Sequence, residues 1–192
     1  MNDDALPALE DRHGLPDALR VLLEDYPREA WESDPAFSQL IRFWLDRHLM
    51  FRRLLAGLTS DTETMLDGDS DLPTYAGRLS RLGSHFVQNL HGHHQIEDAH
   101  YFPRLATLDS RLARGFTILD RDHHAIDGHL SVFADEANGV LTKIDAPGIP
   151  RAELERLRKG IARMTGFLDR HLTDEEELIV PVLLKYQPEG LT

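Results

Sequence analysis

The stretch His91-Gly92-His93-His94-Gln95-Ile96-Glu97-Asp98-Ala99-His100-Tyr101-Phe102-Pro103 determines how the rest of the chain is interpreted. Within it, His93 and Glu97 are four residues apart. On a helix this spacing places both side chains on one face, one turn apart. An imidazole and a carboxylate in that arrangement can bind a metal ion. Surface helices also carry many His and Glu residues, so the pair indicates a metal site only if its face is buried and other helices supply matching residues.

The composition limits the classes of protein to consider. At 192 residues the chain suits one domain that is large enough to bury a core. Its 21 basic and 33 acidic residues give a net charge of −12, which argues against nucleic acid or an anionic membrane as a partner. The sequence has no Cys, so a disulfide framework, a cysteine nucleophile and a thiolate metal site are excluded.

Residues 1–34 are expected to form an N-terminal extension that packs on the main body. A short helix over 17–26 would place Leu residues on one side, and Trp31 is expected to anchor the segment in the core. Residues 1–20 lack the apolar stretch of a signal peptide, and no apolar run in the chain approaches membrane length. We therefore expect a cytoplasmic protein.

Residues 35–187 are expected to form four helices. In four segments the apolar residues recur at steps of three and four, which is the spacing of one helical face. These stripes cover residues 37–58, 75–101, 112–140 and 154–182. Four amphipathic helices joined by modest loops, with no strand-like alternation, indicate an all-α, antiparallel four-helix bundle.

Turn-forming residues predict where the helices begin and end. An Asp-Pro pair at 34–35 is expected to cap the first helix, and 59–68 is expected to be a polar connection. The second helix is expected to start near Asp71, and Pro103 is expected to break or kink it. The expected starts of the last two helices are Asp109 and Pro150.

Every stripe contains a polar residue at a position that should be buried. These residues are His48 in the first helix, His93 and Glu97 in the second, His123 in the third, and His171 and Glu175 in the fourth. A buried, unpaired carboxylate costs several kcal/mol, and no Lys or Arg occupies the stripes. A metal centre would supply the missing positive charge. Four His and two Glu exceed the needs of one tetrahedral zinc ion, whereas imidazole and carboxylate together suit iron.

The order of the residues separates this pattern from ferritin-like sites. Those sites use Glu-x-x-His pairs and more carboxylates. Here the order is His-x-x-x-Glu, and it occurs twice, at 93–97 and 171–175. A ferritin-like centre is therefore disfavoured.

The combined pattern resembles the hemerythrin-like, or HHE cation-binding, family of non-haem di-iron four-helix bundles. The residues that carry the resemblance are His48, His93-x-x-x-Glu97 with Phe102-Pro103, His123 after Asp122, and His171-x-x-x-Glu175 with the following Glu-Leu-Ile-Val-Pro. It covers about residues 35–185. The resemblance implies a hemerythrin-type bundle holding two iron ions, Fe²⁺ or Fe³⁺, with carboxylate and oxo or hydroxo bridges. It also implies that Glu97 and Glu175 are the bridging carboxylates and that the four His are terminal ligands.

One position departs from the pattern of oxygen-carrying hemerythrins, which have a His-x-x-x-His pair on the third helix. Here the second residue of that pair is Asp127. Asp127 is a candidate metal ligand; the alternatives are that it holds water or leaves the position open. His94 and His124 adjoin predicted ligands, but adjacent helical residues point about 100° apart, so ligation by either is left open.

The expected function is that of a non-haem di-iron protein that binds or senses a small ligand such as O2, NO or peroxide. Two other classes could use the same centre. One is a di-iron oxidoreductase that acts as a ferroxidase or consumes peroxide, and the other is a protein-interaction module that the metal staples together. The sequence identifies no protein partner and does not decide whether the protein is an enzyme.

Overall fold

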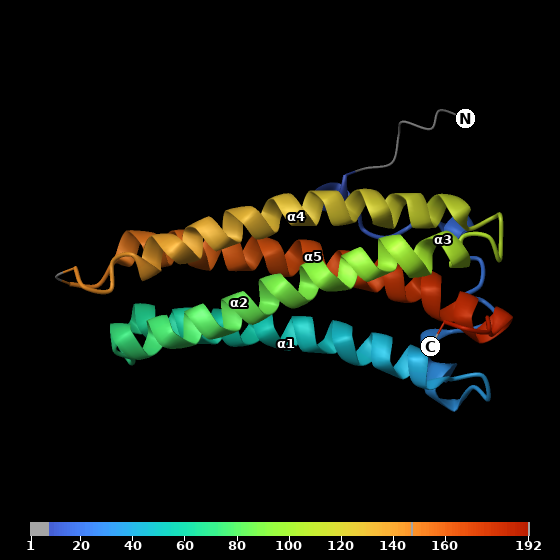
Figure 1. Cartoon of the computed structure of the whole chain (residues 1–192), viewed down its shortest axis with the longest axis horizontal. Coiled ribbons are helices and arrows are strands. Elements are labelled where there is room, and N and C mark those ends of the chain that lie inside the picture. Colours follow the sequence, from blue (N-terminus) through green and yellow to red (C-terminus); the bar gives the residue numbers. More distant parts are fainter. Residues whose placement is uncertain (1–7, 147, 192) are drawn as a thin grey trace. The chain divides into compact units, whose positions relative to one another are not determined.

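The computed structural model describes residues 8–146 and 148–191 (Figure 1). All regular secondary structure in this part of the chain is helical, which confirms the all-α prediction. The long helices are α1 (Gln39–Asp67), α2 (Leu72–Ile96), α4 (Ala113–Leu141) and α5 (Arg151–Tyr186). Residues 1–7 of the predicted N-terminal extension lie outside the described residues.

Contacts divide the chain into two compact units. The first unit holds the described residues up to His48, His94–Ala125 and the described residues from Phe167 onwards. The second unit holds Leu49–His93 and Ile126–Gly166. Each unit therefore contains a segment of all four long helices, and within each unit these segments pack as a helical bundle (Figure 1).

Helix α1 begins later than its sequence predicts. The Asp34 carboxylate accepts a hydrogen bond from the backbone N–H of Ala36 (2.8 Å), which holds a turn at this point. The Ser38 hydroxyl oxygen then accepts a hydrogen bond from the N–H of Ile41 (3.3 Å), as an N-cap does. The helix therefore starts at Gln39, and the predicted start at 34–35 was wrong.

Helix α1 also continues through most of 59–68, where a polar connection is predicted from the sequence. The hydroxyl groups of Thr59, Thr62 and Thr64 donate to backbone carbonyls four residues earlier, so these side chains are satisfied within the helix. Thr62 and Met65 are buried and extend the buried face of the helix. The predicted connection was wrong because its polar residues do not interrupt this face.

The N-terminal segment, residues 8–34, forms three short 3₁₀ helices. They are η1 (Leu9–Asp11), η2 (Asp17–Leu19) and η3 (Arg28–Ser33). The helix predicted over 17–26 is thus reduced to η2 and the turns after it. Leu15, Leu19 and Leu22 nevertheless join the core of the first unit, together with Trp31. Trp31 is 3% exposed, which confirms its predicted role as a core anchor, and its indole N–H donates to the carbonyl of Tyr26 (2.8 Å).

Helix α2 leads into a π-helical turn, η4 (Glu97–Tyr101), followed by the short α3 (Phe102–Leu105). The backbone N–H of Phe102 donates to the carbonyl of Glu97, five residues earlier. The cause is Pro103, which has no N–H and whose ring would clash with the carbonyl four residues before it in a regular α-helix. The predicted break at Pro103 thus takes the form of a widened turn. Such turns are frequent at functional sites, and Glu97 opens this one.

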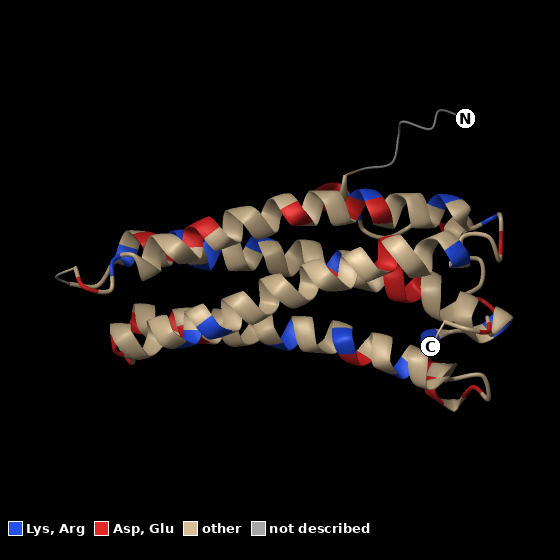
Figure 2. Cartoon of the chain, viewed as in Figure 1, with Lys and Arg blue, Asp and Glu red and all other residues tan. Residues whose placement is uncertain are grey.

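The remaining helices follow the predicted pattern closely. Helix α4 starts at Ala113, a few residues after the predicted Asp109, and α5 starts directly after Pro150. The predicted stripe residues of both helices are buried throughout. Basic and acidic residues are interspersed along the helices, and α5 carries the acidic run 174–177 (Figure 2). None of the described helices combines the length and the hydropathy that a membrane span needs.

Candidate metal centre

Three imidazoles form a cluster in the first unit. His94, His123 and His171 each offer a ring nitrogen that lies within 4.8 Å of those of the other two. The rings of His94 and His123 are stacked with their centroids 3.9 Å apart, and the His171 ring meets that of His123 edge-on at 4.8 Å. All three side chains are at most 2% exposed. This cluster can offer three nitrogen ligands to one metal ion.

A second cluster in the same unit consists of one imidazole and two carboxylates. His48, Glu97 and Glu175 have potential ligand atoms within 4.8 Å of one another and are at most 1% exposed. His93 is the last residue of the second unit and is also buried. It stands on α2 one turn before Glu97, and in its own unit its ring lies 5.3 Å from that of Phe51.

The two clusters meet at the carboxylate of Glu175. Its Oε1 lies 3.5 Å from Nε2 of His48, and its Oε2 lies 3.4 Å from Nε2 of His171. The indole N–H of Trp44 donates to Oε1 (2.6 Å) and fixes the carboxylate in this orientation. In a similar way, Oε2 of Glu97 lies 3.7 Å from Nε2 of His123. Each carboxylate therefore lies near a His of the three-imidazole cluster.

Three of the imidazoles have an acidic partner on the ring nitrogen that faces away from the clusters. Nδ1 of His48 is hydrogen-bonded to Oε1 of Glu176 (2.9 Å), and Nδ1 of His123 to Oδ1 of Asp98 (2.7 Å). Nδ1 of His171 lies 3.6 Å from Oδ2 of Asp122. In metal sites such partners fix the ring orientation and raise the basicity of the ligating nitrogen. The arrangement therefore turns Nε2 of each ring towards the clusters.

Burial has opposite outcomes for the two central carboxyl groups. Burial, together with the neighbouring Glu175, raises the pKa of Glu97 well above its ordinary value. Burial also acts to raise the pKa of Glu175, but the nearby imidazoles of His48 and His171 outweigh it and hold that pKa well below its ordinary value. Burial alone would lower the pKa of His171, yet Asp122 and Glu175 raise it to about 9. A cation among these groups would relieve the repulsion between the two carboxylates.

The donor atoms fit a metal ion. Nε2 of His123, Nε2 of His171 and Oε2 of Glu175 are buried and make no hydrogen bond within residues 8–146 and 148–191. Buried polar atoms are seldom left in that state, and a bound ion is one of the ordinary explanations. The donors are imidazole nitrogens and carboxylate oxygens only, a combination that suits iron.

Comparison with protein families decides the class. A family model described as the hemerythrin HHE cation-binding domain matches residues 39–183. The chain belongs to the hemerythrin HHE cation-binding family. Searches among curated proteins and among solved structures gave no significant match. In a hemerythrin-family chain, these His and Glu clusters indicate a metal-binding site, for which iron is the expected metal.

Within this hemerythrin-family domain, the ion-pair partner of Asp127 is His91, which is not a member of either cluster. Asp127 belongs to the second unit, where its Oδ1 lies 3.2 Å from Nδ1 of His91. The Asp127 side chain is 45% exposed, unlike the buried members of the clusters. His124 is also exposed, and its Nδ1 is hydrogen-bonded to the backbone carbonyl of Asp120 (2.9 Å). Neither residue is therefore placed as the buried cluster residues are.

His94 is the residue that the helical stripes do not single out. A stripe follows one residue per turn, whereas the buried face of a bundle helix is wider and includes positions beside the stripe. His93 and His94 are both buried for this reason. The sequence could have indicated His94 only as a polar residue that adjoins a predicted ligand. Asp122 and Glu176 also adjoin predicted ligands and are also buried.

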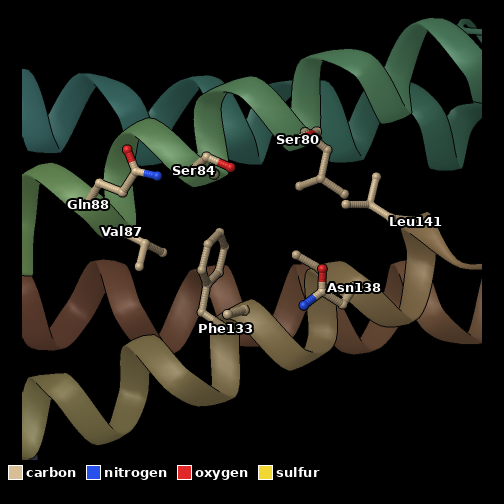
Figure 3. Close-up of a pocket in the computed structure, with 11 residues that line it drawn as sticks. Ser80, Ser84, Val87, Gln88, Phe133, Asn138 and Leu141 are labelled. Carbon is tan, nitrogen blue, oxygen red and sulfur yellow. The ribbon is translucent and has the colours of Figure 1, made fainter.

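The second unit contains a cavity that none of the cluster residues lines. It has a volume of about 240 Å³ and lies between α2 and α4 (Figure 3). Phe133 points from α4 towards Ser84 and Val87 of α2. No His, Asp or Glu lines the cavity, so it offers none of the imidazole and carboxylate ligands that the clusters provide.

Proposed function

We propose that this protein is a non-haem di-iron protein that binds or senses a small ligand such as O2, NO or peroxide. The observation that carries the proposal is the position of Glu175, whose two oxygens face His48 and His171 from different clusters. A carboxylate so placed can bridge two ions, as carboxylates do in dinuclear centres within helical bundles. The proposed ligands are His48, His93, His94, Glu97, His123, His171 and Glu175.

His94 supplies the fifth imidazole of this proposed set. Its stacking on His123 and its 2% exposure favour His94 as a ligand over Asp127. The proposed set then contains five imidazoles, the number found in oxygen-carrying hemerythrins, although the fifth comes from α2. This count favours the ligand-binding class over the oxidoreductase class, because it removes the anionic ligand that Asp127 would have contributed.

The chain's own residues restrict what can bind. When bound, two ferrous ions would supply a redox-active centre for a small ligand. The side chains of the two clusters in the first unit are at most 2% exposed, which favours a ligand of a few atoms over a large organic substrate. The Trp44 N–H holds one oxygen of Glu175, and Glu176 and Asp98 hold the rings of His48 and His123 in orientation.

Elemental analysis after anaerobic reconstitution with ferrous iron tests the proposed metal content. We expect about two iron ions per chain. His94→Ala should lower this number to about one, because it removes one of three nitrogens from one cluster. Asp127→Ala and the control His129→Ala should retain the parent content. A single tightly held zinc ion in the parent would overturn the di-iron proposal, and loss of iron in Asp127→Ala alone would overturn the ligand set.

The reaction with small ligands separates the functional classes. The reduced protein is mixed with O2, NO or peroxide, and its absorption spectrum is followed by stopped flow. A spectral change that reverses when the gas is removed supports ligand binding. Repeated consumption of peroxide or of added ferrous iron would instead support an oxidoreductase. An iron-loaded protein that reacts with none of them would have a metal that only staples the bundle.

A further inference from the structure

Two arginines of the N-terminal segment contact acidic residues that lie next to predicted ligands. Arg12 follows η1 and is only 4% exposed. Its guanidinium group binds both carboxylate oxygens of Asp122, and its Nε donates to Oδ2 of Asp174 (2.8 Å). Arg28, the first residue of η3, donates from Nη2 to Oε2 of Glu176. The segment thus contributes two positive charges to the acidic layer around the clusters.

Each of these contacts continues to an imidazole. Oδ2 of Asp122 lies 3.6 Å from Nδ1 of His171, and Oε1 of Glu176 accepts a hydrogen bond from Nδ1 of His48 (2.9 Å). In both cases, therefore, an arginine contacts a carboxylate, and the same carboxylate contacts an imidazole. His123 provides an internal contrast, because within the described residues Asp98 forms no ion pair with an arginine of the segment.

Stability alone is a weak reason for this arrangement. Taking a guanidinium group and two carboxylates out of water carries a large desolvation cost, so buried ion pairs often add little net stability. The geometry has a more direct effect on the imidazoles. A carboxylate on Nδ1 increases the basicity of Nε2, and an arginine on the same carboxylate both limits that increase and fixes the carboxylate in place.

We propose that Arg12 and Arg28 are positioning residues of the metal centre. They hold Asp122 and Glu176 against His171 and His48, so that the N-terminal segment adjusts how strongly these two imidazoles bind metal. The inference rests on the proposed function for its metal-dependent part. It also makes a statement about the metal-free protein, namely that the segment restrains the orientation of the two rings.

Arg28 is the better site for a test, because its side chain is 48% exposed and its replacement leaves the core intact. Arg28→Gln removes the positive charge that contacts Glu176, whereas Arg28→Lys keeps a positive charge at this position. The matched control is Arg20→Gln in the same segment, because Arg20 pairs with Asp17 and Glu177, which belong to neither cluster. Arg12→Lys serves as the second test variant, since it keeps the buried charge.

In the iron-loaded protein, Arg28→Gln should lower the reduction potential, because a more basic His48 favours the ferric ion. Ferrous iron should also dissociate at a rate that differs from that of the parent by about tenfold, the lower end of the effect of outer ligand partners. Arg28→Lys should return both values most of the way to those of the parent. If Arg28→Gln behaves as Arg20→Gln does in both measurements, the arginine proposal is overturned.

A test on the metal-free protein does not depend on whether the bound metal is iron. Nuclear magnetic resonance of the imidazole nitrogens reports whether Nδ1 of His48 keeps its hydrogen-bonded proton. With no metal ion to hold the ring, loss of the arginine that fixes Glu176 should make this proton exchange faster in Arg28→Gln, and no change is expected in Arg20→Gln. For His171, whose Nδ1 faces Asp122 at 3.6 Å, exchange of the Nδ1 proton is compared between the parent and Arg12→Lys and should also become faster. The Nδ1 proton of His123 should be unaffected in every variant. Unchanged exchange at His48 and His171 would refute the positioning role, whatever metal the parent binds.

Discussion

Replacing Glu97 by Gln should have opposite effects on the metal-free and the iron-loaded protein. Glu97 is 1% exposed, and burial and Glu175 raise its pKa well above the ordinary value. At neutral pH the metal-free folded state must therefore either bind a proton there or hold two repelling charges, and each unit of pKa shift costs roughly 1.4 kcal/mol. Gln has nearly the same shape without the charge. We expect Glu97→Gln to stabilise the metal-free protein by about 1–3 kcal/mol.

In the presence of iron the order should reverse. An ion that binds only the folded state adds about 2.7 kcal/mol at a free concentration one hundred times its Kd. Each tenfold loss of affinity removes roughly 1.4 kcal/mol of that gain as long as the free concentration stays well above the Kd. Because a neutral amide is a much poorer ligand for iron than a carboxylate, the variant should lose most of the iron-dependent stabilisation.

Urea unfolding followed by circular dichroism, with the protein stripped of metal and then loaded anaerobically, measures both effects. Glu155→Gln is the matched control, because Glu155 is a partly exposed glutamate (39%) whose ion-pair partner is Arg158. Its free energy of unfolding should change by no more than about 0.5 kcal/mol in either state. The reasoning about the buried carboxylate would be refuted if Glu97→Gln destabilised the stripped protein, or if iron stabilised the variant as strongly as the parent.

Two further predictions concern packing and pH in the bundle. Burial raises the pKa of Tyr75 to about 12. The unfolded chain therefore releases this proton first, so stability should fall by roughly 1.4 kcal/mol per pH unit between about pH 10 and 12. Tyr75→Phe should flatten this decline, at the cost of the hydrogen bond to Thr62, as urea titrations across that range would show; an unchanged slope would refute it. A Cβ at Gly115 would lie 2.7 Å from a methyl carbon of Leu178, so Gly115→Ala should lower the unfolding free energy by about 1–3 kcal/mol. In Gly166→Ala, where nothing lies within 4 Å, a gain of roughly 0.5–1 kcal/mol is expected from thermal unfolding, and equal losses in the two variants would contradict the packing argument.

The fold followed from the sequence because its main signal is repeated along every long helix. The stripe of α5, from Leu154 to Val182, is buried at each predicted position, including His171 and Glu175. The ends of the helices were harder to predict, since they depend on single hydrogen bonds such as the one that Ser38 accepts from Ile41. Threonine also has a low helix propensity, although Thr59 and Thr62 of α1 donate hydrogen bonds to carbonyls of their own helix.

The candidate site was predicted as six residues that four helices bring together, and in the structure an outer layer of buried acidic residues, Asp122 and Glu176 among them, lies next to these residues. His48, Glu97 and Glu175 could be found because each interrupts an apolar stripe. The outer layer could not be found in this way, because Glu176 and Asp122 look like ordinary surface acids until the helices are packed. Contacts between distant segments, such as that of Arg12 with Asp122, leave no periodic trace in the sequence at all.

The π-helical turn at Glu97–Tyr101 has a consequence for the phase of the helix. One hydrogen bond there spans five residues instead of four, so the chain carries one residue more than a regular α-helix would need over the same rise. Each residue of an α-helix advances the side-chain direction by about 100°. The extra residue therefore sets the angle between the helix face that carries Glu97, a member of one cluster, and the face of α3 that places Phe102 and Leu105 in the core. Deleting a single residue within the turn would therefore rotate the side chains of α3 about the helix axis relative to those of α2, even though no proposed ligand had been removed.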